Sequence, residues 1–122
     1  MIYEQELSNT IIGCAFTVYN TLGRGFLEKV YENALLIELK NKNLDAVNQY
    51  PISVYYNEQV VGEYFADIIV ENKVILELKS VEKLNDVHSA QLLNYLKATN
   101  IKVGYLLNFG SNSKLEFKRL VY

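Results

Sequence analysis

Residues 67–79 read Asp-Ile-Ile-Val-Glu-Asn-Lys-Val-Ile-Leu-Glu-Leu-Lys, and they decide the fold. Aliphatic residues that favour β-strands fill both halves of this stretch, and the polar triplet at 71–73 is typical of a turn. A three-residue loop there pairs Val70 with Val74 and fixes the register of an antiparallel hairpin. The register matters because a slip of one residue would move every side chain of a strand to the other face.

The same register decides where the charged side chains of the hairpin lie. Counting back from the turn along both strands places Asp67 directly opposite Glu77. Since strand side chains alternate, Lys79 shares the face of Glu77, while Leu76 and Leu78 point into the opposite layer. The hairpin is therefore predicted to carry one polar cluster of two carboxylates and an ammonium group.

Outward from the hairpin, the periodicity of apolar residues predicts a mixed α/β domain. Helical spacing appears at residues 7–22, 27–42 and 86–98, with Asp86 as the expected N-cap of the last segment. Runs of β-formers predict strands at residues 52–56, 60–70, 74–79, 102–108 and 115–121. The first three strands should form a meander, and the following helix should return the chain so that the fourth strand pairs parallel to the third. We therefore expect a mixed (α+β) sheet of about five strands flanked by helices.

Size and composition are those of one folded domain. The chain has 122 residues, of which 50% are hydrophobic, and no repeat or low-complexity segment interrupts it. The first residues are acidic and no long apolar run follows them, which argues against a secretory signal or a membrane span and favours a cytoplasmic location. The single cysteine, Cys14, falls in an apolar helical stretch, so we interpret it as a small core residue rather than a nucleophile.

Charge limits how the chain can contact a nucleic acid. A net charge of −2 provides no overall attraction for a polyanion, so any such contact must be local. A basic face could come from the cationic residues of the second half of the chain, which are Lys73, Lys79, Lys83, Lys97, Lys102, Lys114, Lys118 and Arg119. Scattered lysines are also typical of solvated surface, and both interpretations stay open.

Two facing carboxylates repel each other unless a proton or a cation lies between them. Mg²⁺ prefers oxygen ligands and keeps several of its waters, so Asp67 and Glu77 are candidate metal ligands. Such an ion can stabilise charge on a phosphodiester and lower the pKa of a bound water, and Lys79 beside it can orient that water. This combination points to phosphodiester hydrolysis. The alternative is a set of surface charges in which Lys79 only pairs with a carboxylate.

The spacing of these residues resembles a known signature. Within residues 67–79, an Asp is separated by nine residues from Glu-Leu-Lys on the next strand, which is similar to the motif of the PD-(D/E)XK nuclease superfamily. Upstream, residues 25–31 read Gly-Phe-Leu-Glu-Lys-Val-Tyr and resemble the motif of the bacterial GxxExxY family, a branch of that superfamily. The similarity continues through residues 91–99 and 103–110, so it covers nearly the whole chain.

This resemblance implies a restriction-endonuclease-like fold and a metal site. Asp67 and Glu77 would bind Mg²⁺ or Mn²⁺, with the Leu78 carbonyl as a further oxygen ligand. Glu28 would reach the same site from the side, from the second helix. On the residues alone, Glu28 is equally an acidic residue that complements the dipole in a first helical turn.

The resemblance also implies catalytic roles. Lys79 would be the catalytic lysine, and Gln91 and Tyr95, one helical turn apart, are similar to the Gln-x-x-x-Tyr pair that lines the active site in RecB-like and lambda-type exonuclease relatives. Without the resemblance, Tyr95 would be interpreted as a core aromatic and Gln91 as a surface amide. The single histidine, His88, is interpreted as a helix-surface residue rather than as a ligand or base.

The predicted function is a divalent-metal-dependent nuclease whose substrate is DNA or RNA. The alternative is a nuclease-like module that binds nucleic acid or a protein without cutting, and a toxin or defence component whose partner supplies the substrate is a third possibility. Ten tyrosines and many aliphatic residues on a small chain also predict a homodimer, because so much apolar surface is hard to cover.

Overall fold

The computed structural model describes residues 4–122, which form three helices and five strands. Their order is α1 (Gln5–Leu22), α2 (Glu28–Asn41), β1 (Ala46–Tyr56), β2 (Gln59–Val70), β3 (Val74–Lys79), α3 (Asp86–Thr99), β4 (Val103–Asn108) and β5 (Glu116–Val121). The strands form one sheet in the order β1-β2-β3-β4-β5, antiparallel except for the parallel β3–β4 pair. The predicted mixed sheet, its meander and its parallel crossover are confirmed. Within residues 4–122, no helix is long and apolar enough to cross a membrane.

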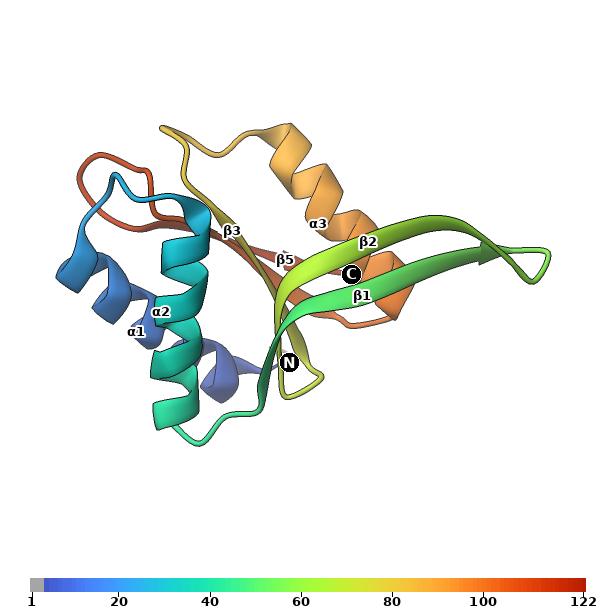
Figure 1. The fold of residues 1–122 in the computed structure, drawn as a ribbon, viewed down its shortest axis with the longest axis horizontal. Helices are drawn as coiled ribbons and strands as arrows, with labels where there is room; N and C mark the ends of the chain where they lie inside the picture. Colours follow the sequence, from blue (N-terminus) through green and yellow to red (C-terminus); the bar gives the residue numbers. More distant parts are fainter. Residues whose placement is uncertain (1–3) are drawn as a thin grey trace.

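Helices cover both faces of the sheet in two apolar layers (Figure 1). On one face, α1 and α2 bury residues such as Leu35 against Leu76 of β3. On the other face, α3 buries residues such as Leu92 near Ile75 of β3. Since neighbouring residues of β3 enter different layers, this central strand is covered on both sides, as a strand with a parallel partner usually is. Cys14 lies in the first layer, where burial raises the pKa of its thiol, and this confirms its interpretation as a core residue.

A side-chain cap starts α3. Asn85 Oδ1 accepts hydrogen bonds from the backbone N–H groups of Val87 at 3.0 Å and His88 at 3.3 Å, and His88 Nδ1 accepts one from the Asn85 N–H at 3.2 Å. The cap is therefore Asn85 and not Asp86 as predicted, since both residue types cap well and only the backbone decides between neighbours. Asp86 instead places its charge in the first turn, where the helix dipole favours it. His88 completes the cap on the helix surface, as its interpretation as a surface residue requires.

β1 begins at Ala46, well before the predicted start at Ile52. Two residues in this extra segment are unfavourable in a strand, so the sequence did not predict it. Pro51 cannot donate a ladder hydrogen bond, but β1 lies at the edge of the sheet, where proline is tolerated. Gln49 has a φ of 50°, in the left-handed region that residues other than glycine rarely adopt. The strand nevertheless continues through both positions.

The β1–β2 hairpin closes through a tighter turn than predicted. Asn57 and Glu58 have φ values of 52° and 64°, and Tyr56 pairs with Gln59 across them. Two consecutive residues with positive φ are the signature of a two-residue type I′ turn, whose twist matches that of the strands it joins. Gln59 therefore belongs to β2 and not to the predicted three-residue turn.

The far half of this hairpin projects from the body of the molecule as a two-stranded arm, residues 50–66 (Figure 1). The pairing of β2 with β3 ends at Ile68, so the arm has no third strand. At its base, the ring of Tyr64 lies 5.5 Å from that of Tyr95 on α3. Large apolar side chains are exposed along the arm, namely Tyr55, Tyr56, Val60, Val61 and Phe65.

Candidate functional site

The site lies at the base of the β2–β3 hairpin, where the predicted register is observed. Val70 pairs with Val74 across residues 71–73, and the regular ladder runs on until it stops just before Asp67 and Glu77. The register therefore confirms that these two acidic residues come opposite each other.

Side-chain carboxylates replace backbone bonds where the two strands separate. The Asp67 backbone N–H donates to Glu77 Oε2 at 2.7 Å, and the Leu78 N–H donates to Asp67 Oδ2 at 2.8 Å. Each carboxylate is thus held by the backbone of the opposite strand. Their side chains are thereby brought together.

Burial, followed by the charges of nearby acidic residues, raises the pKa of both carboxyl groups. Burial is the largest cause for Glu77, the charge of Asp67 is the next, and together they raise its pKa to about 8. Burial is also the main cause that raises the pKa of Asp67, against the lowering effect of its hydrogen bond from Leu78. Lys79 lowers both values, but its positive charge does not offset the other causes. The pair thus holds more buried negative charge than its surroundings compensate.

A chain of hydrogen bonds links β3 to α3 beside the pair. Lys79 Nζ donates to Gln91 Oε1 at 3.0 Å, and Gln91 Nε2 donates to the Tyr95 hydroxyl at 3.2 Å. Tyr95 is buried, and burial followed by the charge of Glu77 raises its pKa. The structure therefore brings Lys79, Gln91 and Tyr95 together next to the carboxylates, with Gln91 and Tyr95 one turn apart as their spacing indicated.

A loop between α1 and α2 is shaped by Tyr31. The Tyr31 ring is fully buried and stacks on Phe109 with 4.6 Å between ring centroids. Its hydroxyl donates to the Gly23 carbonyl at 2.6 Å and accepts from the Phe26 N–H at 3.1 Å. These contacts fix the chain immediately before α2 and therefore the position of Glu28, the first residue of that helix.

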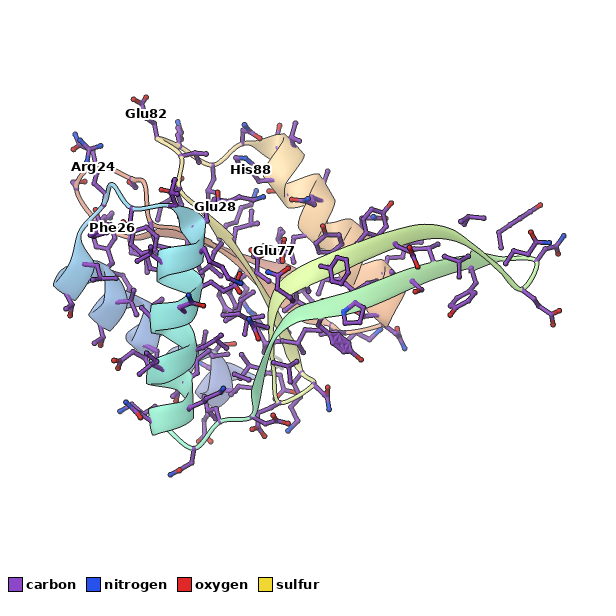
Figure 2. All side chains as sticks on the ribbon, viewed as in Figure 1. Arg24, Phe26, Glu28, Glu77, Glu82 and His88 are labelled. Carbon is purple, nitrogen blue, oxygen red and sulfur yellow. The ribbon has the colours of Figure 1, made fainter. Side chains whose placement is uncertain are left out.

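Glu28 lies near the carboxylate pair without joining it. Glu28 Oε2 accepts from the Ser80 N–H at 3.2 Å, just past the end of β3. Next to the effect of burial, its charge contributes to the raised pKa of Asp67 and Glu77, and Figure 2 shows Glu28 and Glu77 in the region between α2 and α3. Within residues 4–122, no three His, Cys, Asp or Glu side chains form a cluster that could hold a metal ion. The structure therefore brings two of the three predicted carboxylates together.

The Leu78 carbonyl is on the side of β3 that faces β2 and Asp67. The N–H of Leu78 is bonded to Asp67 on the β2 side, whereas the Lys79 carbonyl accepts from the Phe109 N–H, next to β4, at 2.8 Å. Because successive residues of a strand direct their backbone groups to opposite edges, the Leu78 carbonyl faces β2. An oxygen atom is thus available beside the pair.

One buried acidic residue was missed in the sequence. Glu32 on α2 is 4% exposed and accepts hydrogen bonds from Lys29 Nζ at 2.8 Å, Asn48 Nδ2 at 3.2 Å and Gln49 Nε2 at 2.9 Å. Burial is the main cause that raises the pKa of Asp67, and the hydrogen bond from Leu78 lowers it. The charge of Glu32 is a further cause that raises it. Its place on the apolar stripe of α2 was the available signal, since a carboxylate on a buried helix face needs partners.

The oxygen atoms of Asp67, Glu77 and the Leu78 carbonyl fit a hard divalent cation. Carboxylate and carbonyl oxygens are the ligands that Mg²⁺ prefers, and one or two carboxylates with several waters are its usual protein environment. A cation between Asp67 and Glu77 would also offset the negative charge that, next to burial, raises their pKa values.

Comparison with known proteins identifies the family. A sequence model described as the PD-(D/E)XK nuclease superfamily matches residues 5–120. The crystal structure of SSO0001 has a similar fold, with a TM-score of 0.60 at 18% sequence identity, and the match covers 97% of this chain and 58% of that one. The chain therefore spans little more than half the length of that protein. A search of curated proteins gave no significant match. Since the family match extends from α1 into β5 and the mixed five-stranded sheet is of the restriction-endonuclease-like type, the chain belongs to the PD-(D/E)XK nuclease superfamily.

Proposed function

We propose that the chain is a divalent-cation-dependent nuclease that hydrolyses phosphodiester bonds of DNA or RNA. The observation that carries this proposal is the contact between Asp67 and Glu77, with the Lys79 ammonium group alongside. Membership of a nuclease superfamily supports it. Within that superfamily, residues 25–31 favour the bacterial GxxExxY branch, and a cytoplasmic location remains part of the proposal.

The carboxylates and the lysine would act together on the scissile bond. Asp67, Glu77 and the Leu78 carbonyl would hold Mg²⁺ or Mn²⁺, and a bound cation supplies positive charge that lowers the pKa of a water and offsets charge on the phosphate. Lys79, oriented by its hydrogen bond to Gln91, would position the attacking water or stabilise the charge that develops on the phosphoryl oxygens.

The remaining site residues would position the substrate. Gln91 and Tyr95 carry an amide and a hydroxyl beside Lys79, and such donors suit the oxygen atoms of a phosphate. Glu28 would act from the edge of the site, since it bonds to the Ser80 N–H and not to the carboxylate pair. The family resemblance implies that its carboxylate would reach the metal, which requires Glu28 to leave the Ser80 N–H.

A cleavage assay on labelled single- and double-stranded DNA and RNA, with and without Mg²⁺ or Mn²⁺, tests the proposal. We expect cation-dependent cleavage that Lys79→Ala lowers about 100-fold or more, because removal of one group that stabilises transition-state charge typically costs that much. Lys83→Ala is the matched control, since it removes an exposed lysine from the loop after β3 and should leave the rate nearly unchanged. A Lys79→Ala variant that cuts as fast as the parent would falsify the nuclease assignment.

The second candidate is a nuclease-like module that binds nucleic acid or a protein without cutting. The position of Glu28 favours it, because the third predicted carboxylate is bonded to a backbone N–H and two carboxylates alone remain together. Binding without cation-dependent cleavage by the parent protein, on every substrate of the panel, would establish this candidate in place of the first.

We also propose that the chain pairs with a second copy of itself through the arm. The arm exposes Tyr56, 71% exposed, and Phe65, 57% exposed, together with other large apolar side chains. No Lys or Arg occurs between Lys42 and Lys73, so the arm cannot neutralise phosphates and a protein partner fits it better than a nucleic acid. β1 is moreover an edge strand, and a two-fold pair uses the same patch on both copies.

A further inference from the structure

Asp67 is released from regular strand pairing on both of its sides. On the β3 side, its backbone N–H bonds to the side chain of Glu77 and not to a backbone carbonyl. On the β1 side, the residue that the register places opposite Asp67 is Gln49, and this pair is missing although the pairs on either side of it are formed. The β-sheet is therefore interrupted at the one residue that carries the central carboxylate.

The interruption on the β1 side coincides with an unusual backbone. Gln49 has a φ of 50° in the middle of a strand, and a residue with a side chain adopts this conformation at a cost. A left-handed residue cannot continue the regular ladder, so its backbone groups turn away from β2. Some interaction outside the strand must hold Gln49 in this state.

That interaction is with Glu32 on α2. The Gln49 side-chain amide donates to Glu32 Oε1 at 2.9 Å, and the amide of the preceding residue, Asn48, donates to Oε2 at 3.2 Å. Lys29 Nζ binds the same Oε2 at 2.8 Å, so both oxygens of this buried carboxylate are engaged. α2 thus holds two successive residues of β1 at the point where the strand leaves the ladder.

We infer that Glu32 and Gln49 are positioning residues for Asp67. By holding Gln49 in the left-handed conformation, Glu32 keeps the β1 backbone from pairing with the Asp67 N–H, which donates to Glu77 Oε2 instead. That bond keeps the Asp67 carboxylate beside Glu77, where it accepts from the Leu78 N–H. The consequence for cation binding rests on the proposed function. The consequence for the Asp67 geometry does not, because it concerns the protein alone.

Substitutions at both residues separate backbone conformation from side-chain contact. Gln49→Val replaces the residue with a β-branched one that strongly disfavours positive φ, whereas Gln49→Gly keeps the left-handed state accessible and loses only the amide. Glu32→Gln keeps the size of the side chain. Its amide nitrogen would face the hydrogen-bond donors of Lys29, Asn48 and Gln49, which in the parent donate to a carboxylate. Asn43→Val is the control, since it strains an exposed residue with a φ of 61° far from the carboxylate pair in sequence.

Two measurements are made on each variant. The first is hydrogen exchange of the Leu78 amide in the cation-free protein, relative to the slowest amides of β3, and the second is the affinity for Mn²⁺ by calorimetry. We expect Gln49→Val and Glu32→Gln to speed that exchange and to weaken Mn²⁺ binding about tenfold or more, as loss of a residue that orients a ligand typically does. Gln49→Gly should keep an affinity within about threefold of the parent, because glycine adopts positive φ freely. Asn43→Val should lower the melting temperature and change neither measurement.

The outcomes are decisive in both directions. The inference is overturned if folded Gln49→Val shows the parent's Leu78 exchange and Mn²⁺ affinity, or if Gln49→Gly loses both as fully as Gln49→Val. Should Gln49→Val not fold, Glu32→Gln decides in the same way. If the parent itself binds no Mn²⁺, the proposed function fails, and the Leu78 exchange alone then decides the positioning role.

Discussion

At the scale of single residues, the burial of Glu77 beside Asp67 makes the stability of the protein depend on pH. The pKa of Glu77 is raised from its ordinary value of 4.5 to about 8, so the folded state binds a proton that the unfolded state releases in between. This contribution to stability is fully present below about pH 4.5 and is lost as the pH rises through 8. Asp67, whose pKa is also raised, acts in the same direction.

We therefore expect the free energy of unfolding of the cation-free protein to fall between pH 5 and pH 8, by at most about 1.4 kcal/mol per pH unit for one proton. Glu77→Gln should flatten this slope and stabilise the protein at pH 8, because it replaces the titrating group with a neutral acceptor. Glu58→Gln, at the exposed tip of the arm, removes the same charge away from the pair and should leave the slope as it is. Urea unfolding at several pH values measures this, and equal slopes for the parent and Glu77→Gln would contradict it.

The same repulsion predicts that cations stabilise the fold. A cation present at 100 times its Kd should add about 2.7 kcal/mol to the free energy of unfolding, seen as a higher Tm in Mg²⁺ or Mn²⁺. Asp67→Asn should abolish this shift and raise the cation-free stability by on the order of 1 kcal/mol near pH 7, because the Asp67 charge is one of the causes that make Glu77 take up a proton on folding. Calorimetric melting curves with and without the cation measure both effects. The exposed Asp45→Asn is the control, and persistence of the cation shift in Asp67→Asn would remove Asp67 from the ligand set.

At the scale of single elements, the loop before α2 depends on one hydroxyl group. Tyr31→Phe keeps the stacking on Phe109 but loses the bonds to Gly23 and Phe26. We expect a loss of about 1–2 kcal/mol in the free energy of unfolding, because two partly buried backbone groups lose a partner. Denaturant unfolding measures it, with the exposed Tyr55→Phe as the matched control. A Tyr31→Phe variant as stable as the parent would show that the loop is held by packing alone.

Sequence reasoning succeeds for elements whose geometry is local. The register of the β2–β3 hairpin follows from the three-residue turn at 71–73, because loop length fixes strand pairing. Asp67, Glu77 and Lys79 are placed correctly for that reason. Gln91 and Tyr95 follow from helical periodicity, which brings residues four apart onto one face.

Sequence reasoning fails where contacts between distant segments override local preference. The start of β1 was missed because Gln49 and Pro51 both disfavour a strand, and only the edge position and the bond to Glu32 permit it. Glu32 itself was missed because its partners lie on another element. The bond of Glu28 to Ser80 was likewise not predicted, because it depends on the exit of β3, which no local pattern reveals.

At the scale of the whole molecule, the arm is too extended for the body to cover it. The exposed residues Tyr56 and Phe65 lie where β1 and β2 have no third strand, and a two-stranded ribbon is marginal in water by itself. A second copy that packed against the arm would bury these side chains.

We expect sedimentation at tens of micromolar to show a dimer, and Tyr56→Ser with Phe65→Ser to weaken it about tenfold or more, as the loss of buried aromatic contacts usually does. The control is Val87→Ser, which removes an apolar side chain that is 74% exposed on α3, outside the arm. A parent protein that is strictly monomeric at these concentrations contradicts the pairing, and so does equal weakening by Val87→Ser.

The mixture of tight turns and one helical crossover also has a kinetic consequence. Hairpins joined by two or three residues form in about 1–10 μs, so β1, β2 and β3 can pair before α3, β4 and β5 have packed against them. The parallel β3–β4 pair must wait until α3 has packed, because its partners are far apart along the chain. We therefore expect Asp67 and Glu77 to meet early in folding and Lys79 to reach Gln91 only when the crossover closes, so that the closing of the crossover completes the site.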